Sequence, residues 1–283
     1  MMEFIRKRKT DILNINKQGE MVYLTFPAFE ETGVVKHLFS TRYGGVSEGI
    51  FGTLNLSYTR GDKKEAVDEN YRRIAKVLEC EVSDIVCSDQ THTTNIRKVT
   101  KADCGKGVVK ERDYTDVDGL VTDEEGIVLA TFYADCVPLY FLDPVKKVIG
   151  LAHSGWRGTV GRIGAKMIGM MTDEYGCRKE DILAAVGPSI CQDCYEVSED
   201  VAEQFKKEFG ESVLTVGKEP GKYQLDLWKA NEMVFLQAGL LPKQITVTDI
   251  CTCCNSELLF SHRASNGQRG NLGAFMMIKK QIQ

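Results

Sequence analysis

Apolar residues recur every three or four positions in several segments of the chain, a spacing that predicts amphipathic helices. The clearest segment is 62–79, where the apolar positions run from Val67 to Leu78. Asp62 followed by Glu65 resembles a capping box at its start. Three further helices are predicted at 160–171, at 198–209 with Ser198 as the N-cap, and at 225–238, where Gly239 ends the helix.

Shorter runs of β-branched and aromatic residues predict strands. They lie at 21–29, 127–133, 137–142, 147–152, 245–250, 258–261 and 274–278. Glycines crowd the segment 40–55, which is expected to form a shaped loop. The glycines follow neither the GxGxxG nor the GxxxxGK[ST] spacing, so neither a dinucleotide fold nor a P-loop is indicated. The order of the elements predicts an α+β fold, in which mixed β-sheets carry helices on their outer faces.

No Pro-rich or Ser-rich linker and no fixed-period repeat divides the chain, so residues 1–283 are expected to form a single domain. The 36 Lys and Arg against 40 Asp and Glu give a net charge of −4, which disfavours nucleic acid as a partner. The sequence contains no long uninterrupted apolar run, so no membrane span is expected. No apolar stretch follows the N-terminal charges, so a cytoplasmic protein is expected, with its ten cysteines reduced.

Three segments each carry a side chain that binds metals, namely SDQTHTTNI at 88–96, ADCVPLYF at 134–141 and LAHSGWRGT at 151–159. The side chains are His92, Cys136 and His153. Two imidazoles and a thiolate are ligands that zinc favours, and three protein ligands leave a fourth position open, as in catalytic sites. The spacing is also compatible with a core cysteine and two hydrogen-bonded histidines, and it does not decide between the two interpretations.

The same segments, together with HLFSTRYGGVSEG (37–49), TLNL (53–56), GPSICQDCYEV (187–197) and LFSHR (259–263), resemble the YfiH/YlmD family, and its bacterial YlmD members most of all. That family has also been labelled multicopper polyphenol oxidase or laccase. The resemblance implies zinc on His92, Cys136 and His153. It also implies phosphorolysis of adenosine, inosine, guanosine and methylthioadenosine, and deamination of adenosine. Where many members have a Thr-Gly-Arg run, this chain reads Arg269-Gly270-Asn271, so the family's arginine is not assigned there.

The histidine count tests the older label of the family. A multicopper oxidase needs a mononuclear copper site and a trinuclear cluster, which together use far more than the four histidines of this chain. Two histidines and a cysteine are also the ligands of a blue-copper site, but such a site has a long axial ligand as well. Zinc is therefore the expected cofactor, and copper is disfavoured.

Phosphorolysis of a nucleoside needs a site for the phosphate anion. Arg42 is expected to hold it, and Gly44 and Gly45 would let backbone amides approach it, although Arg42 also fits an arginine that caps a turn. Arg157 is a second candidate, or it forms a salt bridge that holds its loop. His37 is expected to donate a proton to the departing purine, unless it is an interior histidine whose hydrogen bonds are satisfied.

Deamination needs an acidic residue that carries protons and does not bind the metal. Asp135 is the candidate, and the alternative is a carboxylate that accepts a backbone amide in a turn. Trp156 is expected to stack on the purine or to pack in the core. Asn55 is expected to bind the ribose hydroxyls or to support a turn.

Two other functions fit the same residues. One is a cysteine hydrolase, with Cys136 as nucleophile and His153 or His92 as base. The other is a nucleoside-binding module without catalysis. Loss of activity on removal of the metal distinguishes the zinc enzyme from the hydrolase, and turnover distinguishes either enzyme from the binding module.

Five further cysteines lie close together in the sequence, as Cys191-x-x-Cys194 and as Cys251, Cys253 and Cys254. A second metal site is one interpretation. Adjacent residues of a strand point to opposite faces, so the second run is cramped for ligands. Reduced core thiols are the favoured interpretation, because free cysteine is often buried.

Overall fold

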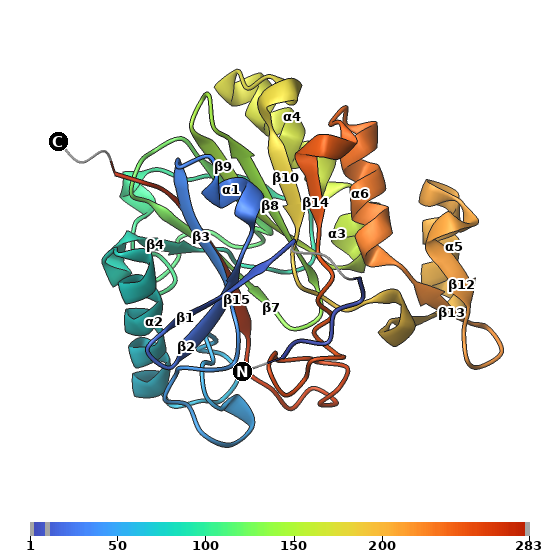
Figure 1. Ribbon diagram of the computed structural model, residues 1–283, viewed down its shortest axis with the longest axis horizontal. Helices are drawn as coiled ribbons and strands as arrows, with labels where there is room; N and C mark the ends of the chain where they lie inside the picture. Colours follow the sequence, from blue (N-terminus) through green and yellow to red (C-terminus); the bar gives the residue numbers. More distant parts are fainter. Residues whose placement is uncertain (1–2, 9–11, 281–283) are drawn as a thin grey trace.

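Two six-stranded β-sheets pack face to face at the centre of the molecule (Figure 1). The computed structural model describes residues 3–8 and 12–280. The strand order is β1-β2-β3-β15-β7-β4 in the first sheet, β14-β10-β8-β9-β6-β5 in the second, and β11-β13-β12 in a small third sheet. The strands are β1 (Asn14–Gln18), β2 (Met21–Thr25), β3 (Val35–Ser40), β4 (Ile85–Cys87), β5 (Ile96–Lys98), β6 (Gly119–Thr122), β7 (Val128–Tyr133), β8 (Val137–Asp143), β9 (Val148–Ser154), β10 (Leu183–Val186), β11 (Glu196–Ser198), β12 (Leu214–Val216), β13 (Lys222–Leu225), β14 (Ile245–Val247) and β15 (Leu272–Ile278).

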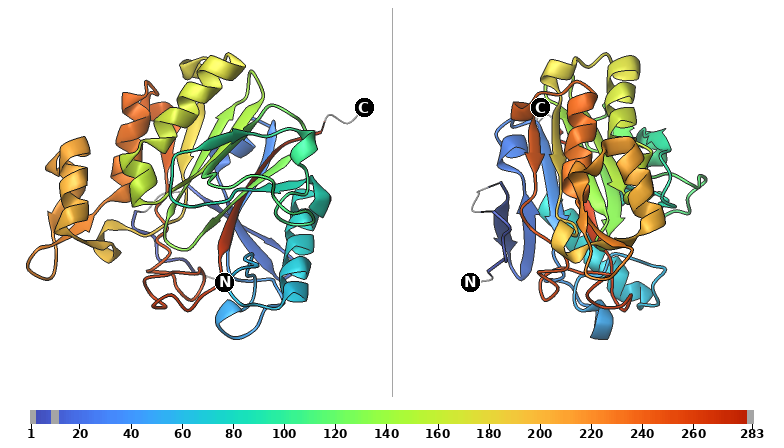
Figure 2. Two further views of the ribbon diagram at one scale, coloured as in Figure 1. Left: turned by 180° about the vertical axis from the view of Figure 1, so that it is seen from behind. Right: turned by 90° about the vertical axis from the view of Figure 1, so that its right-hand side faces the viewer.

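Helices cover the outer face of each large sheet (Figure 2). The helices are α1 (Pro27–Glu30), α2 (Lys64–Leu78), α3 (Trp156–Val160), α4 (Ile163–Tyr175), α5 (Glu199–Phe209) and α6 (Leu227–Gln237). The apolar stripe of α2 packs on the first sheet, and α3, α4 and α6 lie on the second. Both sheets mix parallel and antiparallel pairs. In the first sheet, for example, β7 is parallel to β4 and antiparallel to β15. The predicted α+β fold with helices on the outer faces of mixed sheets is confirmed.

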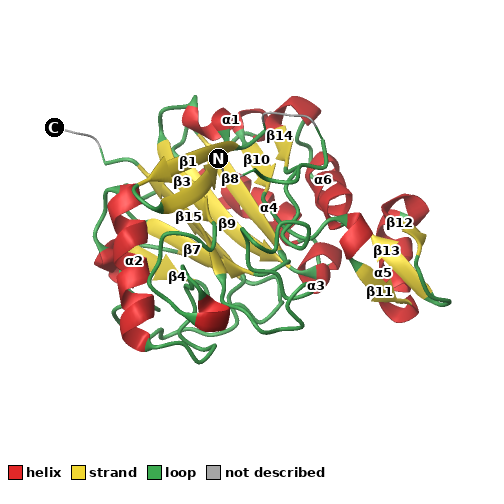
Figure 3. Cartoon of the chain, turned by 60° about the horizontal axis from the view of Figure 1, so that its bottom comes forward, coloured by secondary structure: helices red, strands yellow, loops and turns green. Residues whose placement is uncertain are grey.

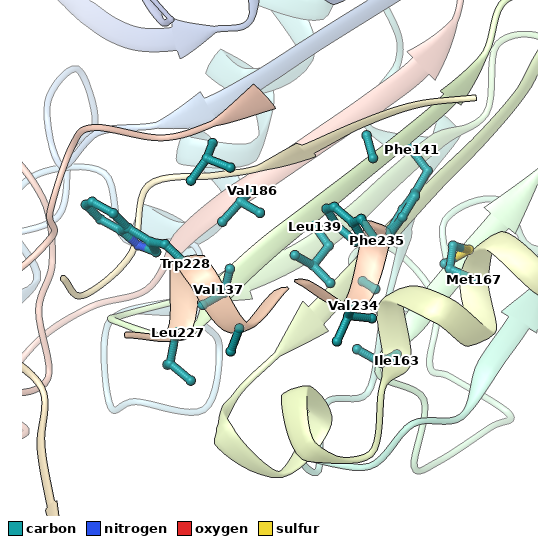
Figure 4. Packing of buried hydrophobic residues seen from close by; sticks show 14 of the residues in the cluster. Val137, Leu139, Phe141, Ile163, Met167, Val186, Leu227, Trp228, Val234 and Phe235 are labelled. Atoms are coloured by element: carbon teal, nitrogen blue, oxygen red, sulfur yellow. The ribbon is translucent and has the colours of Figure 1, made fainter. Parts of the chain in front are cut away.

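The central strands are buried on both faces, and their side chains alternate between two cores. In β15, Leu272 and Met276 point into the core between the sheets, whereas Phe275 points toward α2. In β8, Tyr140 lies between the sheets, and Phe141 packs edge to face on Phe235 of α6, with 5.3 Å between the ring centroids (Figure 4). Strands buried in this way are nearly continuous apolar runs, which is why the sequence identified them.

The third sheet and α5 form a lobe beside the main body (Figure 3). The chain enters this lobe after β10 and leaves it into α6. Phe205 and Phe209 of α5 belong to the same apolar core as α4 and α6, so the lobe is packed onto the body.

Three details of the prediction were wrong. The capping box is absent from α2, whose N-cap is Lys63, because the Asp62 carboxylate instead accepts hydrogen bonds from Ser47 and Asn55. The strand predicted at 21–29 ends at Thr25, and α1 follows with Pro27 in its first turn. The segment 258–261 forms turns instead of a strand. Across the described part of the chain, none of the helices combines the length and apolar character that crossing a bilayer requires.

Candidate active site

His92, Cys136 and His153 come together at one end of the central strands. His153 lies in β9 and is paired with Pro138 of β8, so Cys136, just before β8, lies beside it. His92 comes from the loop after β4. The metal-binding atoms of the three residues all lie within 4.8 Å of one another, with 4.0 Å between Cys136 Sγ and His92 Nε2. The topology therefore brings together three ligands that are far apart in sequence.

A buried carboxylate, Asp118, orients two of these ligands. Its Oδ1 lies 2.7 Å from His153 Nδ1 and also accepts the backbone amide of His92 at 3.2 Å. Its Oδ2 accepts the amides of Thr91 and Thr93. Burial raises the pKa of Asp118, but the hydrogen bonds from His153 and these amides outweigh burial, and the pKa lies below its ordinary value. With Nδ1 held in this way, Nε2 of His153 is the atom left for a metal.

The backbone around the three ligands leaves little free space. His92 has a φ of 67°, in the left-handed region, which turns its side chain toward Cys136. Gly155 lies against the same group, because a Cβ at this position would be 2.9 Å from His92 Cδ2 and 3.4 Å from Cys136 Sγ. A side chain at position 155 would thus push into the space between the ligands.

The protonation of Cys136 and His153 is coupled. Burial raises the pKa of the Cys136 thiol, but the neighbouring imidazoles outweigh burial and lower it to about 6. Burial lowers the pKa of His153, but the thiolate and Asp118 raise it to about 9. Zinc sites use thiolate and imidazole donors, often with a carboxylate that hydrogen-bonds to an imidazole ligand. The free atoms of Cys136, His92 and His153 converge in this way, and Asp118 is the carboxylate behind His153. The residues present therefore fit a zinc ion with an open position.

A pocket of about 790 Å³ opens beside the three ligands, and all three line it. Aromatic side chains contribute to its wall, among them Tyr58, Tyr114 and Phe132. Four cationic side chains line it as well, namely Arg60, Lys110, Arg112 and Arg269. The pocket thus combines metal ligands, ring faces and positive charge.

Arg269 is the least exposed of these cations. Its Nη1 donates to the carbonyl of Gly270 at 3.2 Å and contacts Asn271, while its buried Nε has no hydrogen-bond partner among the described residues. Burial and the nearby charge of Arg60 lower the pKa of Arg269 to about 10. Arg112 differs, because it is paired with Asp89 at 2.8 Å. Arg60 and Arg269 both line the pocket, so positive charge lies beside the candidate metal ligands.

Arg42 does not line this pocket. Its Nε donates to the carbonyl of Gly52 and its Nη1 to the carbonyl of Ser256, so the side chain fastens two loops. Gly44 and Gly45 lie against the backbones of Met21 and Thr53, with no room for a Cβ. These contacts agree with the alternative in which Arg42 holds a turn, and the expected phosphate site at Arg42, Gly44 and Gly45 stays a prediction.

Asn55 and Asp135 are also engaged within the protein. The Asn55 side chain donates to Asp62 and accepts the amides of Ser57 and Asn271, so it ties the pocket's loops together from behind. Asp135, with a φ of 88°, accepts the Thr252 hydroxyl at 2.6 Å and the Arg263 amide at 2.7 Å. Neither residue lines the pocket. The contacts that the structure gives them hold loops, and their expected contacts with the ribose and with transferred protons stay predictions.

His37, Trp156 and Arg157 lie outside the pocket lining too. The His37 ring is packed among aromatic side chains, and its Nε2 accepts the amide of Phe26 at 2.7 Å, as expected for an interior histidine. Trp156 packs against the core on the outer side of the second sheet, and the exposed Arg157 guanidinium lies over its ring at 4.4 Å. The proton donor, stacking and anion-binding roles expected for these residues have no geometric support.

Sequence reasoning missed Asp118, Arg60 and Arg269. Asp118 is 35 positions from His153, and a carboxylate behind an imidazole leaves no local spacing to recognise. Arg269 belongs to the short run in which the chain departs from the family pattern, and that departure was itself the available signal.

The family described as multi-copper polyphenol oxidoreductase laccase matches residues 36–279. The chain is 39% identical over 243 residues to purine nucleoside phosphorylase YlmD of Geobacillus stearothermophilus, covering 84% of this chain and 88% of that protein. It is 37% identical over 247 residues to purine nucleoside phosphorylase YlmD of Bacillus subtilis, covering 86% and 88%.

A comparison of folds agrees with these sequence matches. The crystal structure of the Bacillus licheniformis hypothetical protein YfiH is similar with a TM-score of 0.88 and 32% identity, covering 95% of this chain and 100% of that chain. The chain therefore belongs to the YfiH/YlmD family.

Proposed function

We propose that this protein is a zinc-dependent purine nucleoside phosphorylase that acts on adenosine, inosine, guanosine and methylthioadenosine. The observation that carries the proposal is the pocket itself, which Arg60 and the largely buried Arg269 line together with the three candidate metal ligands. Relatives that match most of the chain are named purine nucleoside phosphorylases. A phosphorylase needs an anion site beside a nucleoside site, and this pocket offers charge and ring faces together.

His92 Nε2, Cys136 Sγ and His153 Nε2 are the atoms that would hold the zinc ion. When bound there, zinc supplies a Lewis acid at the floor of the pocket. Asp118 keeps the His153 ring in the tautomer and orientation that binding requires. The neighbouring imidazoles lower the pKa of Cys136 to about 6, which favours the thiolate form that binds a metal.

Arg60 and Arg269 would bind hydrogen phosphate at the other side of the pocket. An oxygen of the phosphate forms a bond to C1′ of the ribose as the bond from C1′ to the purine nitrogen breaks. The departing purine takes up the proton that hydrogen phosphate carries, so the products are ribose 1-phosphate and the free base, and charge is conserved. The positive charges of Arg60 and Arg269 favour binding of the phosphate dianion.

The purine would stack on the aromatic wall. Phe132 and Tyr58 are half-buried, so each leaves part of its ring accessible to the pocket. Stacking on a ring tolerates different purines, since each has a flat π-face. This tolerance agrees with the proposed range of four nucleosides, which differ at the edge of the base or at the 5′ position of the sugar.

Deamination of adenosine is the second proposed reaction, at the same site. It needs a carboxylate to carry protons. Two carboxylates line the pocket, and Asp89 is already paired with Arg112. Glu111, which has no ion pair among the described residues, is therefore the candidate in place of Asp135. The Glu111→Gln variant is expected to lose inosine formation from adenosine while it still phosphorolyses inosine.

The test uses protein whose zinc content has been quantified. It is incubated with adenosine or with inosine, with and without phosphate, and the products are resolved by chromatography. Free base that appears only with phosphate, and only in zinc-loaded protein, is the expected result. A zinc-loaded sample that releases no base and no ribose 1-phosphate overturns the phosphorylase.

A cysteine hydrolase is the second candidate function, because Cys136, His153 and Asp118 are arranged as nucleophile, base and orienting carboxylate. The two functions respond oppositely to removal of the metal. A hydrolase keeps its activity in metal-free protein and loses it on alkylation of Cys136. The phosphorylase loses its activity when the metal is removed and regains it when zinc is restored.

A further inference from the structure

A second group of metal-binding side chains lies outside the pocket. Cys191 and Cys194 form a Cys-x-x-Cys pair around the 3-10 turn η5 (Gln192–Cys194), between β10 and the lobe. Cys251 and Cys254 form another such pair after β14. The four sulfur atoms all lie within 4.8 Å of one another, and all four thiols are free. Two Cys-x-x-Cys pairs are the ligand pattern of tetrahedral structural sites.

The distances between the sulfur atoms suit one small ion. A tetrahedral tetrathiolate with zinc–sulfur bonds of about 2.3 Å places its sulfurs about 3.8 Å apart. Cys254 Sγ lies 3.5 Å from Cys194 Sγ and 4.0 Å from Cys191 Sγ. The cluster therefore has the right size to close around a metal with only small side-chain movements.

Backbone amides support the cluster as well. The amides of Cys191 and Cys254 both point at Cys251 Sγ, at 3.2 and 3.4 Å. Amide donors aimed at a sulfur stabilise a thiolate and fix the orientation of a ligand. Packing of neutral thiols in an apolar core requires no such donors.

The local backbone differs from the strand on which the sequence-based preference for core thiols depended. Cys251 forms an isolated bridge with Ser189 and residues 252–254 form a turn, so the expected alternation of a strand does not apply. The turn brings Cys251 and Cys254 to the same side and leaves Cys253 out of the converging group. The premise that made the run cramped was therefore wrong.

We propose that Cys191, Cys194, Cys251 and Cys254 bind a zinc ion of their own, as a closed structural site. With four protein ligands, this site has no open position for substrate. It is separate from the group formed by His92, Cys136 and His153, and it holds whether or not the protein is a phosphorylase.

The second zinc ion fastens two loops that support the active site. Thr252, inside the second Cys-x-x-Cys pair, donates to Asp135, the residue directly before Cys136. Arg263 links the same carboxylate to the first pair, because its amide donates to Asp135 and its Nη1 to the carbonyl of Cys194 at 3.0 Å. The metal thus holds in place the turn that presents Cys136.

The experiment counts zinc in chain purified without chelators, by elemental mass spectrometry. The unaltered protein is expected to contain two zinc ions per chain. Cys136→Ala is expected to keep one and Cys191→Ser to keep one, whereas the matched control Cys253→Ser keeps two. X-ray absorption of the Cys136→Ala protein is expected to show zinc surrounded by sulfur alone, at about 2.3 Å.

Three results overturn the proposal. They are a single zinc ion in the unaltered chain that disappears with Cys136→Ala, iron in place of zinc at the four thiols, and a disulfide between any two of them in freshly isolated protein. If Cys191→Ser fails to fold, the counts for the unaltered chain and for Cys136→Ala still decide. None of these readouts depends on nucleoside turnover, so failure of the phosphorylase proposal is seen separately.

Discussion

The Asp118 carboxylate lies 2.7 Å from Nδ1 of His153 and binds the loop of His92 through backbone amides at the same time. One side chain therefore fixes a ligand on β9 and a ligand on the loop after β4. Sheet pairing also brings the two segments together, because Asp89 bridges to Val117 and β6 pairs with β9, and the Asp118 side chain adds a direct link between them. The rigidity of the metal centre thus depends on a residue that does not reach the metal position.

The variant Asp118→Asn keeps the size of the side chain and removes its charge. It is expected to weaken zinc binding about 10- to 100-fold, because Asn cannot fix the His153 tautomer as a carboxylate does. Competition with a chromophoric chelator measures the affinity. An unchanged affinity contradicts the positioning role, and Asp123→Asn, at an exposed carboxylate beyond β6, serves as the control.

The variant Gly155→Ala tests the space between the ligands. Its added Cβ would lie 2.9 Å from His92 Cδ2, so the imidazole has to move and the zinc affinity is expected to fall. The backbone φ of Gly155 is −69°, which alanine adopts freely, so the effect is steric and not conformational. Gly169→Ala, where no atom lies within 4 Å of the added Cβ, is expected to leave the affinity unchanged. Equal affinities in both variants contradict this account.

The variant Arg269→Met tests the anion site. Loss of charge-assisted hydrogen bonds is expected to raise the KM for phosphate about 10- to 100-fold, with less effect on the binding of inosine. Steady-state kinetics at varied phosphate measures this separation. Arg157→Met serves as the control, since Arg157 is exposed and outside the pocket.

The opposite outcome is expected for a substitution of Arg42, which affects stability and not phosphate binding. Because its guanidinium donates to the Gly52 and Ser256 carbonyls, Arg42→Met is expected to lower the free energy of unfolding and to leave the KM for phosphate near its original value. Denaturant unfolding and the same kinetic assay measure the two quantities. A large rise in the KM for phosphate with unchanged stability restores the sequence-based role of Arg42.

The buried His37 is expected to lower the free energy of unfolding at acid pH. Burial lowers its pKa from the ordinary 6.5 to about 3. Between these pH values the unfolded chain binds a proton that the native chain does not, so the free energy of unfolding decreases as the pH falls below about 6.5. His37→Gln keeps an acceptor for the Phe26 amide without titrating. Denaturation of metal-free protein at about pH 7 and about pH 5 is expected to give a smaller loss for the variant, and equal losses contradict the assignment.

The sequence predicted the elements that are long or buried on both faces. The periodicity from Val67 to Leu78 became α2, and the apolar runs at 127–152 became β7, β8 and β9. Short strands such as β4 and β10 were missed, because three or four residues carry little pattern and their conformation is imposed by neighbouring strands. The apolar residues Leu259 and Phe260 of the 258–261 segment are buried, although this segment is not a strand.

The candidate site residues also differ in how far the sequence predicts them. His92, Cys136 and His153 were found because zinc restricts its ligands to few residue types. From sequence Arg42 is the expected anion ligand and Arg269 is not assigned, whereas in the structure Arg269 lines the pocket and the Arg42 guanidinium donates to carbonyl groups. Residue type indicated the three side chains that converge, whereas the proposed phosphate site depends on which guanidinium the fold brings to the pocket.

The position of β15 has a consequence for how the chain folds during synthesis. β15 lies between β3 and β7 in the first sheet, and its Gly273 amide bonds to Ser40, 233 residues earlier. Until residues 272–278 leave the ribosome, β3 and β7 each lack their shared neighbour and present unpaired edges. The nascent chain therefore cannot complete its first sheet co-translationally from its N-terminal half, and truncation before 272 is expected to yield an aggregating product for chaperones to capture.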